Sequence, residues 1–464
     1  MINRKLATDT LEKQWEKQRW RERLTVVLII GLPTLLAVGW LWFGLVGRTL
    51  WARCPPSCRN ADFQGTTQPA SDWQGNDLQG ANFTQASLSG ANFAHADLYF
   101  ANFQRAQLQG VDFRGAKLRG ANLSKANLQQ ANFTDADLGG AQLSGANLTG
   151  ALLFGTTLAG AILDGAVLQG VQRNEATDLP AKWQLVWSIV NQPARGRSLL
   201  QADLARANLT GAQLVDADLR QADLFAADLS GAVLSGARLE GVNLRRTQLD
   251  ATTQMAPKWR LVWQLVNQVE AKRTLANADL SGANLREVYL RGANLQQANL
   301  AGAWLIDADL RMADLRNANL QQADLTNASL REAMLAGAKF QGANLTNIDF
   351  TWANLRGVQL DATTPNLSPR WRLAWELINQ GGAGRNLAKA SLTYLDLAGV
   401  DLHGANLQQS NLQYTRLQGA NFKNADLRNA DLRNADLRQA DFTGALLTGA
   451  ELTNAQVDGA VGLP

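Results

Sequence analysis

A large apolar side chain, usually Leu or Phe, returns at every fifth residue over most of this chain. Ala commonly stands two residues before it, and Asn or Asp one residue before it, as in Ala136-Asp137-Leu138. A period of five fits neither an α-helix, with 3.6 residues per turn, nor a β-strand, with a period of two. The chain can aim every fifth side chain into one core only if each unit bends in the same way. The sequence therefore predicts a solenoid of short repeats.

The five-residue repeat runs in four blocks, and its register changes between them. In the first block the large apolar position begins at Trp73 and continues without a gap to Leu168. Three non-repeating segments separate the four blocks, and a linker precedes the first block. We expect a linker at residues 48–72 and solenoid blocks at residues 73–170, 198–250, 274–361 and 386–464.

The unit Ala-(Asn/Asp)-(Leu/Phe)-x-x resembles that of the pentapeptide-repeat family, and the resemblance covers nearly all of the chain after residue 60. It implies an all-β fold, a right-handed four-sided β-helix in which four pentapeptides make one turn. In such a fold Leu138 and Ala136, with their equivalents, point inward, and the other three positions face water. The resemblance also implies that Asp137 and its equivalents form hydrogen bonds with the backbone at the bends.

Glycine is frequent two residues after the large apolar position, as at Gly110, Gly115 and Gly120. Gln, Asn and Arg occupy the same position in other repeats. Glycine is the residue that adopts positive φ without a steric cost. Because other residues replace it so often, we expect that this position does not require positive φ.

The three segments between the blocks, at residues 171–197, 251–273 and 362–385, are copies of one another. Each holds a proline, two tryptophans four residues apart and an Asn-Gln pair. The Trp pairs are Trp183/Trp187, Trp259/Trp263 and Trp371/Trp375. Proline suits the first turn of a helix and the apolar residues follow helical spacing, so each segment predicts a short α-helix. We favour helices that bury their Trp pairs on the solenoid; the alternative is that the pairs are presented to a partner or a membrane.

Residues 24–47 contain no charged side chain, and the run is long enough for a helix to span a bilayer. The run exceeds the apolar stretch of a usual signal peptide, so we expect a single uncleaved transmembrane helix. Seven basic residues precede it, within an amphipathic segment at residues 1–23, and three follow it up to residue 60. This bias places residues 1–23 in the cytoplasm and the solenoid across the membrane. The family's abundance in cyanobacteria implies the periplasm or the thylakoid lumen.

The two cysteines stand close together as Cys54-Pro-Pro-Ser-Cys58, between the predicted anchor and the solenoid. Their spacing differs from the C-x-x-C of redox motifs, and the lack of accompanying histidines makes them a poor zinc site. If the solenoid lies outside the cytoplasm, a small disulfide loop is expected. The alternative is two free thiols.

Sequence features of catalysis are missing. The only two histidines, His95 and His403, occupy outward repeat positions far apart in the chain. No phosphate loop or nucleophile motif occurs, and most carboxylates fill the Asn/Asp position of the repeat. We therefore predict a protein that is not an enzyme, with no cofactor, no metal site and no small-molecule substrate.

The formal net charge of +4 is concentrated near the N-terminus, because residues 61–464 hold 34 basic and 36 acidic side chains. A nearly neutral solenoid argues against electrostatic binding to nucleic acid. It also disfavours a role known in the resembled family, in which an acidic rod mimics DNA and inhibits gyrase.

Some outward positions carry residues other than small polar ones. Tyr394 and Tyr414 are twenty residues apart and should stack on neighbouring coils, and Trp352 is also expected to face outward. The residues that we consider for partner contact are Arg291, Arg311, Arg331, Trp304, Tyr394 and Tyr414. The arginines are explained more simply as a solvated ladder, offset by acidic neighbours such as Asp309 and Glu332.

Two functions remain. The sequence favours a membrane-anchored, non-enzymatic scaffold or protein-interaction module, held in the membrane by residues 24–47 and binding a protein that the residues do not identify. The alternative that the family resemblance implies is a DNA-mimicking topoisomerase (gyrase) regulator. A fold alone does not decide between them.

Overall fold

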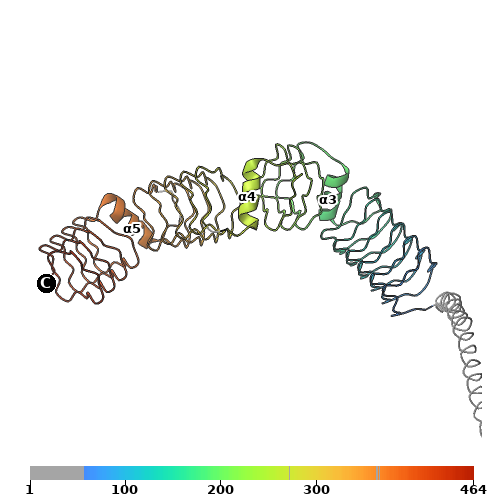
Figure 1. Ribbon diagram of the computed structural model, residues 1–464, viewed down its shortest axis with the longest axis horizontal. Helices are drawn as coiled ribbons and strands as arrows, with labels where there is room; N and C mark the ends of the chain where they lie inside the picture. The colour runs from blue at the N-terminus through green and yellow to red at the C-terminus, as the bar shows by residue number, and fades with distance from the viewer. Residues whose placement is uncertain (1–56, 271, 362–363, 365, 464) are drawn as a thin grey trace, which may run out of the picture.

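The computed structural model describes residues 57–463, except for residues 271, 362–363 and 365. This part of the chain consists of four stacks of coils that follow one another along an arc (Figure 1). Three helices lie at the boundaries between the stacks: α3 (Ala181–Asn191), α4 (Pro257–Asn267) and α5 (Pro369–Gln380). Each helix occupies one of the segments that interrupt the five-residue repeat.

Neighbouring coils pair in parallel at a separation of twenty residues, which corresponds to four pentapeptides. Asn82 bridges Asn102, which in turn bridges Asn122. The backbone N–H of Phe83 donates to the carbonyl of Asn102 (2.7 Å), and the N–H of Asn102 donates to the carbonyl of Ala81 (2.9 Å). This is the pairing of a β-helix, as predicted. Across the described residues the bridges are isolated, one per pentapeptide, so the faces pair without extended strands.

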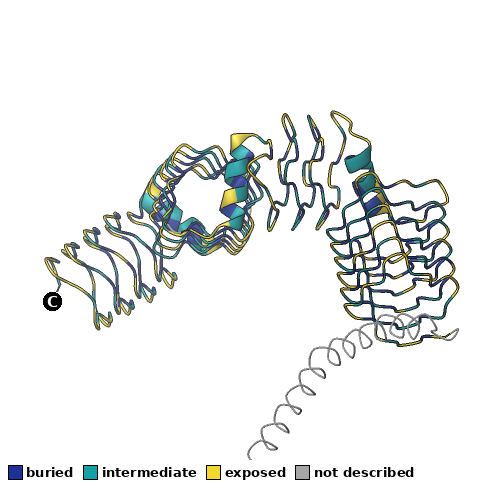
Figure 2. Ribbon diagram, turned by 45° about the vertical axis from the view of Figure 1, so that its right-hand side comes forward, coloured by how far each residue is buried: buried dark blue, intermediate teal, exposed yellow. Residues whose placement is uncertain are grey.

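The core holds the large apolar side chains and the alanines that the repeat pattern assigns to it. Leu138 and Ala136 are buried, as are most of their equivalents in all four stacks, and Figure 2 shows the inner side of the coils as buried. In the first stack Phe83 and Phe103 lie face to face, with ring centroids 4.8 Å apart. Burial of each large side chain contributes about 1.5–3 kcal/mol before the entropy of folding is counted.

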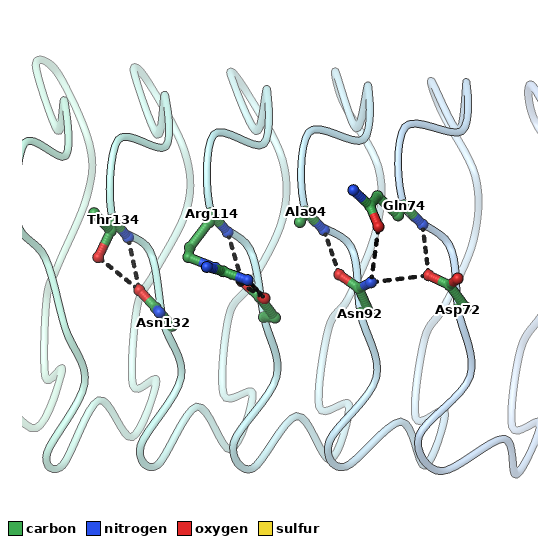
Figure 3. Close-up of polar contacts among 8 residues, drawn as sticks. Asp72, Gln74, Asn92, Ala94, Arg114, Asn132 and Thr134 are labelled. Carbon is green, nitrogen blue, oxygen red and sulfur yellow. Dashed lines mark hydrogen bonds and ion pairs between the residues drawn. The ribbon is translucent and has the colours of Figure 1, made fainter.

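The Asn/Asp position stabilises the bends through its side-chain oxygen, as the family resemblance implied. Asn132 Oδ1 accepts the backbone N–H of Thr134 at 3.0 Å, and Asp137 Oδ1 accepts that of Gly139 at 2.9 Å. Figure 3 shows the same bond repeated on successive coils of one face. Adjacent coils are also linked there, because the Asn92 amide donates to Asp72 at 2.9 Å. An Asn or Asp in this position therefore fixes a turn and joins two coils.

The corner of each repeat is the residue two positions after the large apolar one. The expectation that this corner does not require positive φ is wrong. Glycines there have positive φ, and so do Gln85 and Lys125, both at 59°. The turn itself imposes this conformation: Ala86 N–H donates to the Phe83 carbonyl at 3.0 Å, which closes a β-turn with Gln85 as its third residue. A residue other than glycine pays about 1–2 kcal/mol for this conformation. The pairing of the coils must therefore offset that cost at many positions.

The helices bury their first tryptophan in the core, which confirms the favoured arrangement of the Trp pairs. Trp183, Trp259 and Trp371 are 5%, 5% and 7% exposed. The second tryptophan of each pair is half-buried, and its indole N–H donates to a backbone carbonyl of the preceding coil. These bonds run from Trp187 to Val171 (2.8 Å), from Trp263 to Thr247 (2.7 Å) and from Trp375 to Val358 (2.6 Å).

The asparagine near the C-terminal end of each helix fastens the helix to the coil before it. In α3, the Asn191 amide donates to the Leu168 carbonyl at 2.9 Å, and its oxygen accepts the N–H of Gly170 at 2.6 Å. Asn267 and Asn379 make the equivalent bonds in α4 and α5. The repeated Asn therefore has a structural role.

Each helix is a wedge between two stacks. At one corner the stacks meet directly, because a corner residue before the helix donates its N–H to the carbonyl of a corner residue after it. The pairs are Gly165 to Arg206 (2.7 Å), Gly241 to Gly282 (2.8 Å) and Trp352 to Tyr394 (3.0 Å). Elsewhere the helix separates the stacks, and Figure 1 shows the rod turning at these junctions.

The predicted segments at residues 1–23 and 24–47 lie outside the described residues, and so does Cys54. Within residues 57–463, with the gaps given above, no helix combines the length and apolar character needed to cross a bilayer. Cys58 is buried and takes part in a disulfide bond. The Cys54–Cys58 loop and the transmembrane helix remain predictions.

Candidate interaction surface at the α5 junction

Most charged side chains of the repeats form ion pairs with other side chains of the rod. In the sequence Asp-Leu-Arg, the Arg guanidinium turns back onto the Asp two residues earlier. Arg220 contacts both oxygens of Asp218 in this way (2.8 and 2.7 Å), and these bonds lower the pKa of Asp218 to about 2. Among the described residues, no three His, Cys, Asp or Glu side chains are grouped so that they could hold a metal ion.

The three arginines of the predicted ladder have separate surroundings. Arg311 forms a bidentate pair with Asp309 (2.7 and 2.6 Å), which holds the pKa of Asp309 below its usual value. Arg331 contacts Glu332 at 3.4 Å, and Arg291 lies 3.8 Å from the sulfur of Met312. The interpretation as a solvated, offset ladder fits Arg311 best. Only Arg331 lies against another of the unusual outward residues, as described below.

Trp304 covers the corner of the α4 junction and does not join the other predicted residues. A Cβ atom at Gly241 would lie 3.1 Å from its ring, and the Arg286 guanidinium is 5.5 Å from a ring centroid. Its half-buried side chain therefore closes the space above the Gly241 corner. Trp304 has a structural explanation.

Tyr394 and Tyr414 stack as predicted. Their ring centroids are 4.9 Å apart with an interplanar angle of 3°, and the two side chains are 38% and 40% exposed. Trp352 extends the stack across the α5 junction, with its ring 5.7 Å from that of Tyr394 at an angle of 62°. We call Trp352, Tyr394 and Tyr414 the aromatic column.

Two arginines flank the aromatic column. The guanidinium of Arg331 is 4.6 Å from the Trp352 ring centroid, and that of Arg416 is 5.6 Å away. Arg416 has only a long contact, 3.9 Å, with the nearest carboxylate, that of Asp396. Burial raises the pKa of Asp396, although Arg416 and Arg356 oppose the shift. Both guanidinium groups are close to half exposed, so they border an accessible surface.

The other two junctions show that this surface is not needed to join two stacks. At the α3 junction the same three corner positions hold Gly165, Arg206 and Ala226, and at the α4 junction they hold Gly241, Gly282 and Gly302. All three members of the aromatic column have positive φ, between 54° and 58°. Positive φ is common to this corner throughout the rod, as at Phe100 and Met312, but bulky residues adopt it less readily than glycine. The α5 junction therefore carries three large side chains where glycine would be easier.

Sequence reasoning placed Trp352 outward but did not join it to the tyrosines. A search for column partners at multiples of twenty misses the pair, because Trp352 and Tyr394 are 42 residues apart. The α5 insert contributes the additional residues. Trp352 also lies one residue further from the first Trp of its insert than Gly165 and Gly241 do, so alignment of the inserts on their Trp pairs misses the contact as well.

The fold defines a class of protein, a parallel β-helical repeat protein, and the comparisons name its family. The family described as pentapeptide repeats (8 copies) matches more than half of the chain, so the chain belongs to the pentapeptide-repeat family. The matched segments are residues 77–115, 112–150, 195–224, 222–253, 275–311, 313–351, 335–364, 386–424 and 425–461.

Several solved structures are similar in sequence. HetL from the cyanobacterium Nostoc sp. strain PCC 7120, a pentapeptide repeat protein involved in heterocyst differentiation regulation, is 27% identical over 64% of this chain and 96% of that chain, with a TM-score of 0.15. A pentapeptide repeat protein from the Arabidopsis thaliana thylakoid lumen is 30% identical over 26% of this chain and 76% of that chain, with a TM-score of 0.20. QnrB1, a plasmid-mediated fluoroquinolone resistance protein, is 19% identical over 42% of this chain and 88% of that chain, with a TM-score of 0.20. No match was found among the curated proteins.

Proposed function

We propose that this protein is a non-enzymatic scaffold, anchored in a membrane by residues 24–47, that binds a protein partner through the aromatic column and its flanking arginines. The observation that carries the proposal is the difference between the three junctions. Two junctions have corners of glycine, alanine and arginine, and the third carries the aromatic residues Trp352, Tyr394 and Tyr414 at the same positions. Trp, Tyr and Arg are the residues enriched at binding hot spots between proteins.

The membrane part of the proposal is supported by the uncharged run at residues 24–47 and the seven basic residues before it. These features favour a rod outside the cytoplasm, and the family's abundance in cyanobacteria suggests the periplasm or the thylakoid lumen. The rod is long and regular, and its charged groups are largely paired with one another, which suits a support for other proteins better than a catalyst.

The alternative, a DNA-mimicking regulator of gyrase, needs a surface of unpaired negative charge. In the C-terminal stack, Asp426, Asp431 and Asp436 each receive a bidentate contact from the Arg two residues later. This pairing removes the negative surface that imitation of DNA would require. It favours the scaffold over the gyrase regulator.

Site-specific photo-crosslinking in native membranes tests the proposal. We expect that p-benzoylphenylalanine placed at Tyr414 captures one protein in stoichiometric yield. The control is the same group at Phe100, a corner aromatic in the first stack that is 73% exposed and has a φ of 56°. Equal capture of many proteins at both positions would contradict a specific surface at the α5 junction.

A further inference from the structure

We propose that the surface at the α5 junction takes an acidic segment of its protein partner, whose carboxylates pair with Arg370 and with the arginines on Trp352. The inference rests on the proposed function and specifies the kind of partner. Its starting point is a second difference between the junctions, this time in the helix.

In α3 and α4 the residue before the first tryptophan is a lysine with a carboxylate partner in the following stack. Lys182 lies 2.9 Å from Asp203, and Lys258 lies 3.1 Å from Asp279. In α5 the equivalent cation is Arg370, and Ser391 occupies the place of the aspartate, 21 residues later in all three copies. The α5 junction has therefore kept the cation and lost its counterion.

Arg370 is incompletely satisfied within the described residues. Its Nη2 donates to the Thr393 carbonyl, and its guanidinium lies 4.6 Å from the Trp371 ring centroid. Its Nε is buried and has no hydrogen-bond partner in the described part of the chain. Burial lowers the pKa of Arg370, and Asp349 and Tyr394 oppose this shift without forming an ion pair with it. The Arg370 side chain as a whole is only half-buried, so a partner carboxylate would meet the Nη groups of its guanidinium and not the buried Nε.

The unsatisfied cation lies beside the aromatic column. Arg370 contacts the carbonyl of Thr393, the residue before Tyr394, and Arg331 and Arg416 lie against Trp352 on the same junction. The aromatic column and the half-exposed Arg331 and Arg416 thus border one surface patch, with the half-buried Arg370 beside it. Its charge complements an acidic segment, and its tyrosines and tryptophan supply the apolar contact area that protein hot spots use.

The position of the patch along the rod favours a protein segment over the headgroups of the anchoring membrane. The α5 junction lies toward the end of the described rod opposite to its N-terminal, blue end (Figure 1). At about 4.8 Å per stacked coil, the coils between Ser57 and Trp352 extend for on the order of 65 Å along the arc. The Debye length at physiological ionic strength is about 8 Å, so a rod that stands upright on its anchor would hold the patch beyond the reach of charges on that membrane.

The test measures binding of a fluorescein-labelled tetraglutamate peptide to the full-length chain in a non-ionic detergent, by fluorescence anisotropy. We expect binding that weakens with salt. The variant Ser391→Asp should weaken it roughly tenfold, because it supplies Arg370 with the carboxylate that Lys182 and Lys258 already have. The variant should fold, since aspartate occupies the same place at both other junctions. Arg370→Gln should also weaken binding, through loss of the cation, and provides an independent check.

The matched control is Asp279→Ser, which frees Lys258 at a junction whose corners are glycines, and we expect it to leave peptide binding unchanged. Unchanged binding in both Ser391→Asp and Arg370→Gln would overturn the inference. Equal binding of a tetralysine peptide would also overturn it. Phosphatidylglycerol vesicles that bind more tightly than the peptide and lose binding in Ser391→Asp would assign the patch to lipid instead. If Ser391→Asp leaves the photo-crosslinked partner at Tyr414 unchanged, the scaffold function stands and the acidic segment is rejected.

Discussion

The indole N–H of Trp352 donates a hydrogen bond to the backbone carbonyl of Tyr414, 62 residues further along the chain and 2.9 Å away. This bond links the third stack to the second coil of the fourth stack, past α5. The aromatic column therefore contributes to the junction as well as to the exposed surface. Experiments on it must separate the two contributions, and the glycine corners of the α4 junction supply the variant that does so.

The core and the surface of a coil should respond very differently to substitution. Leu310 is fully buried, so Leu310→Asp places an unpaired charge between coils and should destabilise the rod by at least several kcal/mol. Arg311→Ala removes a half-exposed ion pair with Asp309 and should cost at most about 1 kcal/mol. Thermal unfolding of the two variants checks this. Similar losses would mean that the inward and outward positions are wrongly assigned.

The Trp pair of α4 should be required for stability. Trp259 is buried and Trp263 donates to the Thr247 carbonyl, so Trp259→Ala/Trp263→Ala leaves a cavity and an unpaired carbonyl. Truncation of one buried tryptophan typically costs about 3–5 kcal/mol. We expect a clear fall in melting temperature, with Phe100→Ala, at an exposed corner, as the control. An unchanged melt would show that the pair is not part of the core.

Acid should weaken the rod through its Asp–Arg pairs. The pKa values of Asp218, Asp314 and Asp431 are lowered to about 2, in each case chiefly by a hydrogen bond from the Arg two residues later. A carboxyl group with a lowered folded-state pKa stabilises the fold fully above its unfolded pKa, about 4, and this contribution is lost as the pH falls toward 2. Melting temperatures should therefore drop over this interval. Asp218→Asn should melt lower at neutral pH and lose less on acidification; an identical acid profile would contradict the assignment for this pair.

The predicted membrane anchor and its orientation can be tested separately from the fold of the rod. If residues 24–47 span a membrane, the protein should stay in the membrane pellet after washing with alkaline carbonate. In sealed vesicles of cytoplasmic-side-out orientation, protease should remove only the segment at residues 1–23. Release by carbonate, or digestion of the rod in those vesicles, would contradict the anchor or its orientation.

The five-residue pattern was sufficient to predict the interior of the rod, because burial at Leu138 or Phe83 depends only on the repeat itself. The helices were also predictable, since the spacing of Trp183 and Trp187 places both on one face. The conformation at Gln85 was not, because it follows from the closure of each turn. The variety of residues at this corner suggested that positive φ is not required there. Several residue types adopt positive φ at this corner because the pairing of the coils offsets the strain.

The candidate surface was only partly predictable. Tyr394 and Tyr414 stack because both lie in one stack with an uninterrupted register, and the spacing of twenty residues revealed them. Contacts that cross a helix, such as Trp352 with Tyr394 or Arg370 with Thr393, depend on how many residues the insert adds to a coil. The missing counterion at Ser391 does not follow from the sequence pattern, because it depends on the ion pairs of Lys182 with Asp203 and of Lys258 with Asp279.

The central claim, that the aromatic column binds a partner, is tested most directly by giving the α5 junction the corners of the α4 junction. The variant Trp352→Gly/Tyr394→Gly/Tyr414→Gly reproduces Gly241, Gly282 and Gly302 and also relieves the strain of three bulky residues at positive φ. Partner recovery after chemical crosslinking of native membranes should be measured beside the melting temperature of the same variant. We predict a melting temperature within a few degrees of the wild type and loss of most of the partner. Undiminished recovery from a folded variant would contradict the account.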